Sequence, residues 1–151
     1  MSIVVGYLAT PEGRTALEAA TVEAQKRSTR LVVVTSHQGN DRELRGTPDE
    51  ELALNEVCRG LDERGVPHEV RLVARSRDVA DDLIAAAEEN DGSLIVIGLR
   101  RRSPVGKLIL GANAQRILLD APCPVLAVKP ELAARVAPVV ERELAGTTSR
   151  E

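Results

Sequence analysis

The chain has 151 residues, which suits one domain, and its 43% of apolar and 28% of charged residues are ordinary for a globular protein. Phe and Trp are absent and Tyr7 is the single Tyr, which excludes a nucleic-acid platform built from stacked aromatic rings. The net charge of −3 gives no overall basic field and also argues against nucleic acid as a partner. Because the sequence has no basic-then-apolar leader and no apolar run of about 20 residues, we expect a cytoplasmic protein without a membrane partner.

Strand and helix patterns alternate along the chain. Short apolar or alternating runs predict five β-strands, at 3–8, 31–35, 70–74, 94–97 and 125–128. Capping signals and helically spaced apolar residues predict four helices between them, beginning at Thr10-Pro11, at Thr47-Pro48, at Ser76 or Asp78, and before Ala114. This alternation predicts a parallel α/β sheet with helices on both of its faces.

Two of the predicted strands have the character of sheet edges. In 70–74 apolar residues follow Glu69 and alternate with Arg71, as in a strand with one less buried face. The run Val125–Val128 is apolar throughout, and as the last element it can lie at an edge, where unpaired backbone favours pairing with another chain. We therefore hypothesise a homodimer that forms through Val125–Val128.

The end of the chain differs from the rest. We predict one domain at 1–130 and a tail at 131–151. The tail begins with helical spacing at Leu132 and Val136, meets Pro138 and finishes in a polar stretch, so we expect it to be helical or partly disordered.

The segment after the fourth strand carries glycine and positive charge. Gly98 is expected at the carboxyl edge of the sheet, where the lack of a Cβ allows close approach of a ligand. Arg100–Arg102 and Lys107 follow within ten residues and can pair with phosphate oxygens, although a solvated basic loop has the same composition. Both interpretations stay open at this point.

Known phosphate-binding and catalytic patterns do not match. A P-loop would need a glycine near Arg101 and a hydroxyl at Leu108, and the first strand is not followed by the glycine pattern of dinucleotide-binding folds. His37 and His68 stand in no recognisable constellation, and Cys58 and Cys123 have no redox spacing. We therefore expect a protein that is not an enzyme, with no catalytic residue and no metal.

Three segments resemble the universal stress protein family. They are IVVGYLATPEGRTALEAA at 3–20, LIVIGLRRRSPVGKLILGANAQRIL at 94–118 and APCPVLAVKP at 121–130. The resemblance implies a five-stranded, parallel, doubly wound sheet of strand order 3-2-1-4-5 with helices on both faces, the adenine nucleotide alpha hydrolase-like fold. It also implies a crevice for ATP or AMP formed by Gly6, Thr10, Ser36, Gly98, Arg101, Ser103, Gly106, Lys107, Gly111, Ala112 and Asn113.

The nucleotide motif of the family, G-x2-G-x9-G-[ST], is altered here. Gly98 and Gly111 match its first and third glycines, while Arg101 and Ala112 replace the second glycine and the hydroxyl. Leu8 also stands where the family's nucleotide binders usually carry an Asp. A variant S-P-x-G-K loop that occurs in the family would supply the hydroxyl of Ser103, the amide of Gly106 and the cation of Lys107.

The resemblance therefore implies a dimeric, stress-response binding module with a weak adenine nucleotide site and an unidentified regulatory protein partner. An interaction module of the same fold, with its crevice closed by Leu8 and Arg101, is the alternative. A regulator that grips nucleic acid through Arg100–Arg102 is a third class, which the charge and composition disfavour.

Overall fold

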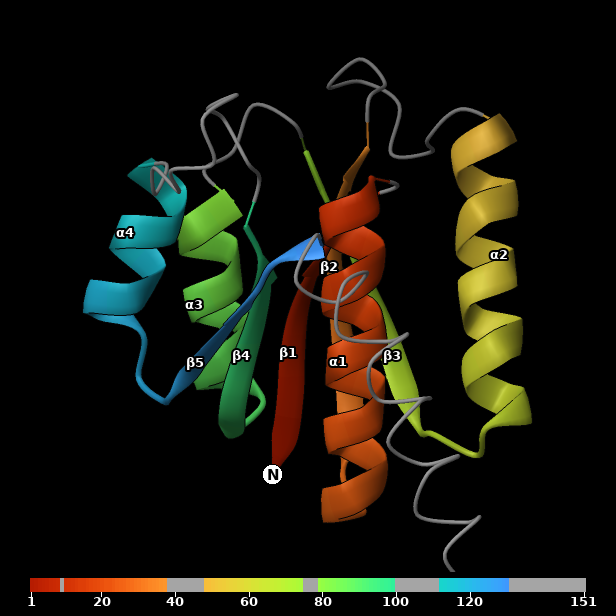
Figure 1. Cartoon of the computed structure of the whole chain (residues 1–151), viewed down its shortest axis with the longest axis horizontal. Helices are drawn as coiled ribbons and strands as arrows, with labels where there is room; N and C mark the ends of the chain where they lie inside the picture. Colours follow the sequence, from red (N-terminus) through yellow and green to blue (C-terminus); the bar gives the residue numbers. More distant parts are fainter. Residues whose placement is uncertain (9, 38–47, 75–78, 100–111, 131–151) are drawn as a thin grey trace, which may run out of the picture.

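The computed structural model describes residues 1–8, 10–37, 48–74, 79–99 and 112–130, in which strands and helices alternate (Figure 1). Their order along the chain is β1 (Ser2–Tyr7), α1 (Pro11–Arg27), β2 (Arg30–His37), α2 (Pro48–Glu63), β3 (His68–Ala74), α3 (Val79–Glu89), β4 (Gly92–Gly98), α4 (Ala112–Asp120) and β5 (Val125–Val128). These elements confirm the predicted strands and helices within a few residues. The predicted caps of α3, Ser76 and Asp78, lie outside the described residues.

All five strands form one parallel sheet in the order β3-β2-β1-β4-β5, which confirms the expected fold and places β3 and β5 at the edges. The register pairs Tyr7 of β1 with Thr35 of β2, and Gly98 of β4 with Val128 of β5. Since the chain moves from β1 to β3 in one direction and then returns to β4, the order reverses between β1 and β4. That reversal point is where ligands bind in open α/β sheets.

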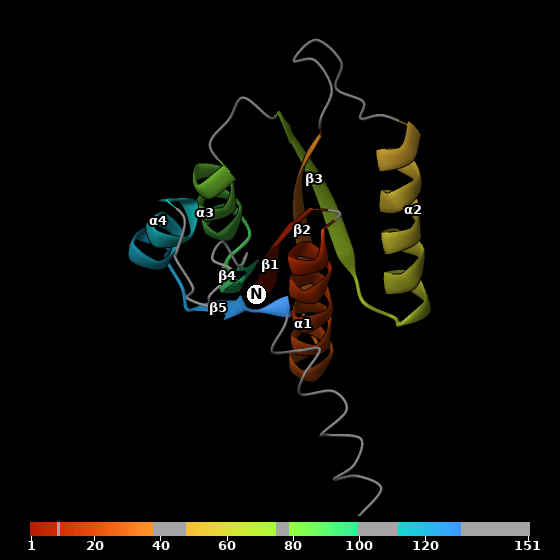
Figure 2. The same cartoon turned by 45° about the horizontal axis from the view of Figure 1, so that its top comes forward.

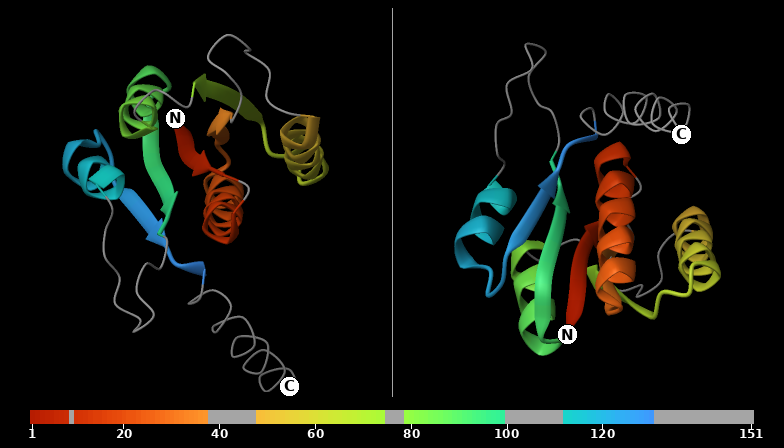
Figure 3. Two further views of the ribbon diagram at one scale, coloured as in Figure 1. Left: turned by 90° about the horizontal axis from the view of Figure 1, so that it is seen from above. Right: turned by 60° about the horizontal axis from the view of Figure 1, so that its bottom comes forward.

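Helices cover both faces of the sheet, as predicted. In the view from above, α1 and α2 lie on one side and α3 and α4 on the other (Figure 3). Successive side chains of each strand point to opposite faces of the sheet. Ile3 and Val5 pack with buried residues of α1 and α2, whereas Val4 packs with buried residues of α3 and α4. The central strands are therefore buried on both faces, which explains their near-continuous apolar sequence.

Helix α1 is held close to the sheet by small residues. Ala16, Ala20 and Ala24 recur every four residues and are fully buried against the strands. The helix begins where the Thr10 side chain accepts a hydrogen bond from the Gly13 amide at 3.1 Å, and ends where Ser28 adopts a left-handed conformation. The N-terminus of α1 is thereby fixed at the carboxyl edge of the sheet (Figure 2).

Candidate functional site

A pocket of about 300 Å³ opens at the carboxyl ends of β1, β2 and β4, at the reversal of strand order. This volume is at the lower end of the range of small-molecule sites, about 300–1,000 Å³. Its walls come from strand ends, from the first turn of α1 and from α3 and α4: Gly6, Tyr7, Leu8, Glu12, Val34, Thr35, Ser36, Val73, Val79, Leu83, Ile97, Gly98, Leu99, Asn113, Ala114 and Ile117. The pocket thus combines residues from seven elements, β1, α1, β2, β3, α3, β4 and α4, and from the residues that directly follow β1 and β4.

Apolar side chains dominate the walls and polar groups are few. Leu83 of α3, Ile97 of β4 and Ile117 of α4 are buried, whereas Ser36 and Asn113 are partly or fully exposed to solvent. Such a lining suits a largely apolar group that makes a small number of hydrogen bonds. Within the described residues, no group of three or more His, Cys, Asp or Glu side chains could hold a metal ion.

Four of the predicted site residues line this pocket. They are Gly6, Ser36, Gly98 and Asn113, which the fold brings together from β1, β2, β4 and α4. Thr10 does not line it, because its hydroxyl caps α1. Ala112 is the first residue of α4. Arg101, Ser103, Gly106, Lys107 and Gly111 lie outside the described residues.

Gly98 has a packing reason to be glycine. A Cβ at this position would lie 2.2 Å from the backbone oxygen of Glu12, and a Cβ at Gly13 would lie 1.9 Å from the backbone oxygen of Leu8. Both contacts are with backbone, which cannot move aside as a flexible side chain can. The sequence predicted close approach of a ligand at Gly98, and the structure places the first turn of α1 in that close contact.

Leu8 stands at the mouth of the pocket. Half of its surface is exposed, and it lines the pocket without filling it. Its side chain offers no hydrogen-bond acceptor for a sugar hydroxyl. Glu12, a first-turn acid of α1, is the acidic residue among those that line the pocket.

The N-terminus of α4 lies at the same edge of the sheet. Asn113 and Ala114 of its first turn line the pocket, and that turn contains no acidic residue. The first amides of a helix carry partial positive charge and lack partners within the helix. An anionic group on a ligand would therefore be stabilised at this end of the pocket.

The other titratable candidates are structural in character. Burial raises the pKa of Tyr7, with the nearby Arg14 charge opposing this, so the phenol stays neutral near pH 7. The ring Nδ1 of His68 lies 3.0 Å from the backbone oxygen of Val66, away from the pocket. Burial also raises the pKa of Cys58 and Cys123, which opposes formation of a reactive thiolate.

The sequence profile of the universal stress protein family matches residues 1–129, and the chain belongs to this family. A universal stress protein of Mycolicibacterium smegmatis is 44% identical over 128 residues, which cover 85% of this chain and 97% of that protein. A solved universal stress protein from Archaeoglobus fulgidus has a TM-score of 0.65 at 34% identity and covers 85% of this chain and 98% of that one.

A further solved structure shows a universal stress protein from Archaeoglobus fulgidus in complex with dAMP, with 27% identity and a TM-score of 0.61 over 85% of this chain and 98% of that one. The family and the five-stranded fold are thus established by sequence and by structure together. In the part of the chain that the structure describes, no helix is both long enough and apolar enough to span a membrane.

Proposed function

We propose that this protein is a cytoplasmic, homodimeric stress-response module that binds an adenine nucleotide weakly and catalyses no reaction on it. The observation that carries the proposal is the apolar pocket at the reversal of strand order, beside the N-terminus of α4. Support comes from the similar Archaeoglobus fulgidus protein that was solved with dAMP. Binding of ATP or AMP would then alter the interaction of the module with a regulatory protein.

The proposed pose follows the chemistry of the walls. The adenine ring would lie among Val34, Val73 and Leu83, where the walls of the pocket are apolar. The phosphates would lie towards the first amides of α4, which stabilise negative charge. Three residues named above keep the binding weak: Leu8 and Ala112 provide no side-chain polar group, and Arg101 replaces a glycine of the family motif.

Calorimetric titration of nucleotide-stripped protein with ATP, AMP and GTP at two salt concentrations tests this proposal. We expect the affinity for ATP and the affinity for AMP each to change little between the two salt concentrations. GTP is expected to bind less tightly than either. Ala114→Leu places a larger side chain in the pocket wall and is expected to abolish binding, while Ala53→Leu on α2 is the matched control outside the pocket. Equal binding by both variants would place the nucleotide elsewhere.

The alternative is an interaction module whose crevice no longer takes nucleotide, and the lack of a hydrogen-bonding group on Leu8, which lines the pocket, favours it. A variant that restores the family motif, Arg101→Gly with Ala112→Ser, separates the two functions. Binding by the unmodified chain supports the nucleotide module. Binding by the double variant alone supports the interaction module. Strong binding of oligonucleotide that falls steeply with salt would instead support a nucleic-acid regulator.

The absence of catalysis is tested separately. With leucine in place of an acid at position 8, we expect no hydrolysis of ATP that depends on Mg²⁺. The measurement is release of phosphate from ATP with Mg²⁺ or with a chelator present. Metal-dependent release that is lost in Lys107→Ala would make the protein an ATPase.

The proposed dimer forms through β5. The backbone oxygens of Pro124 and Val128 accept hydrogen bonds from the amides of Ile95 and Leu99 at 3.0 and 2.8 Å. The alternation of a parallel ladder therefore directs the N–H and C=O groups of Val125 and Ala127 outwards. Pairing of this edge with its own copy about a two-fold axis makes the two β5 strands antiparallel.

Strand pairing alone is too weak to hold this dimer at micromolar concentration. About four hydrogen bonds at about 1 kcal/mol each would give a dissociation constant near 1 mM. Helix α4 lies beside β5 (Figure 1), and its exposed Leu118 and Leu119 offer additional apolar surface. Sedimentation at micromolar concentration tests the dimer, and a monomeric profile would contradict it.

A further inference from the structure

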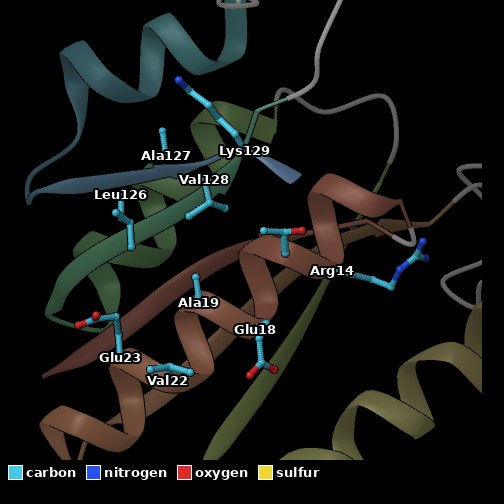
Figure 4. Close-up of a pocket in the computed structure, with 10 residues that line it drawn as sticks. Arg14, Glu18, Ala19, Val22, Glu23, Leu126, Ala127, Val128 and Lys129 are labelled. Atoms are coloured by element: carbon cyan, nitrogen blue, oxygen red, sulfur yellow. The ribbon is translucent and has the colours of Figure 1, made fainter. Parts of the chain in front are cut away.

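A second hollow, separate from the pocket, lies between α1 and β5. It has a volume of about 700 Å³, and Figure 4 shows its side chains. Ala19 and Val22 of α1 face Leu126 and Val128 of β5 across it. Charged side chains of Arg14, Glu18, Glu23 and Lys129 lie around it. We refer to this hollow as the α1–β5 groove.

The groove exists because one face of the sheet is incompletely covered. On the side of α1 and α2, α2 lies over the β3 end of the sheet, and α1 lies over its centre and contacts β5 without burying Leu126 (Figures 1 and 3). Leu126 consequently keeps 36% of its surface exposed, although it belongs to a strand. An apolar groove of this kind is typical of a site that another segment covers.

The chain itself leads into this groove. Lys129 lines it, and Pro130, which follows, has helical backbone conformation and is the last residue described. Proline is favoured in the first turn of a helix, since its fixed backbone angle suits the helix and its missing N–H is not needed there. A segment that continues from Pro130 therefore starts at the end of the groove without any linker.

The sequence after Pro130 has the apolar pattern that such a position requires. Apolar residues recur with helical spacing, at Leu132, Val136, Val139, Val140 and Leu144. Residues 131–145 would form a helix of about 22 Å, close to the length of about 25 Å expected for the 17 residues of α1. Pro138 lies off this apolar stripe, so its ring would face solvent. Because proline lacks an N–H, it would remove one hydrogen bond and bend the helix at this point.

Comparison with relatives indicates that this segment is additional to the shared domain. The family profile ends at residue 129, and the Mycolicibacterium smegmatis relative matches over 97% of its own length but only 85% of this chain. The segment therefore lies beyond the part of the chain that the family profile matches.

We propose that residues 131–145 fold back as an amphipathic helix and cover the α1–β5 groove of their own chain. Direct attachment at Lys129 makes this binding intramolecular, with an effective concentration in the millimolar range or above. The helix would cover side chains of β5 on the α1 side and leave the outward backbone groups of Val125 and Ala127 accessible. The proposal is independent of nucleotide binding.

Methyl NMR of the full chain tests the proposal. Leu132→Asp with Val136→Asp puts two charges on the apolar stripe, and we expect the methyl signals of Val22, Leu126 and Val128 to shift while those of Leu119 on α4 do not. Ala134→Asp with Ala145→Asp adds the same charge on the opposite side of the stripe and is the matched control. Unshifted groove methyls in the first variant, or equal shifts in both, would overturn the proposal.

A second experiment changes the α1–β5 groove in place of residues 131–145. Val22→Asp is expected to release the segment, so that the backbone amide signals of 131–145 sharpen, whereas Leu119→Asp on α4 leaves them unchanged. In a mixture of isotope-labelled and unlabelled full chains, contacts between 131–145 and groove methyls should arise within one chain. Contacts between different chains would show that a second copy supplies the helix and would overturn the proposal as stated.

Discussion

The two edges of the sheet differ in length, charge and neighbours. Strand β3 has seven residues, and its polar side chains are tied to the elements beside it: Glu69 pairs with Arg30 of β2, and Arg71 lies 2.6 Å from Glu89 of α3. Strand β5 has four residues, all apolar, and borders the α1–β5 groove. Charged side chains on an edge strand oppose pairing with another chain, and an apolar edge lacks that protection.

This difference is the reason for placing the proposed dimer at β5 and not at β3. The exposed ion pairs of β3 contribute little stability, about 0–1 kcal/mol each, because water and salt screen them. Their effect is on specificity, since a strand that pairs with β3 would have to accommodate these charges. Leu72 on β3 is also exposed, so charge rather than lack of apolar surface distinguishes the two edges.

The largest effect is expected from proline on the outer backbone of β5. Ala127→Pro removes an outward N–H from each copy, and loss of two hydrogen bonds of about 1 kcal/mol each would weaken the proposed dimer about 30-fold. Leu72→Pro is the matched change on β3. The backbone oxygen of Pro67 accepts a hydrogen bond from the Leu31 amide of β2, so the alternation along the strand directs the Leu72 N–H away from β2. Sedimentation should show dissociation of the dimer in Ala127→Pro and not in Leu72→Pro. Equal dissociation of the two variants would mean that β5 and β3 do not differ in their contribution to the dimer.

A charge on β5 should give this edge the protection that β3 has. Leu126→Lys places two ammonium groups near each other across the antiparallel dimer, and we expect about tenfold weaker association from their repulsion and desolvation. Leu126→Met keeps the side chain apolar and is the control. A dimer that sediments unchanged in Leu126→Lys would place the interface away from β5.

The reverse exchange removes the protection of β3. Glu69→Val with Arg71→Val deletes both ion-paired side chains from this edge, and we expect new, concentration-dependent association beyond the dimer. Light scattering over a concentration series measures it, with Glu69→Gln and Arg71→Gln as polar controls. If the valine variant remains a dimer at the highest concentration, the charges are not what blocks this edge.

The smallest effect is expected from salt. Raising the ionic strength from about 0.1 M to 1 M shortens the screening length from about 10 Å to 3 Å, which weakens exposed ion pairs but not apolar contact. The dimer constant of the unmodified protein should therefore change less than about threefold in sedimentation. A steep fall with salt would mean that charged side chains hold the two copies together.

Most of the fold followed from local patterns in the sequence. The Thr10-Pro11 signal predicted the start of α1, and the apolar runs located the strands, including Val125–Val128 with the bounds found in the structure. Strand order followed from the resemblance and not from periodicity, because pairing between distant segments such as β1 and β4 leaves no local signal in one sequence.

The candidate site was predictable only in part. Gly98 was recognised because it follows a strand pattern, whereas Gly6 and Ser36 were implied by the family resemblance. Leu83 and Ile117 were missed, since they are helix residues with the same spacing as any core residue, and only packing turns them towards the pocket. The reason for glycine at position 98 also required coordinates, because it depends on the backbone of Glu12.

The placement of Tyr7 has a spectroscopic consequence. It is the single Tyr in a chain without Trp or Phe, and it lines the pocket. All intrinsic tyrosine fluorescence of this protein therefore originates at the proposed nucleotide site. Occupancy of that site can be followed by emission from an unlabelled, unmodified chain.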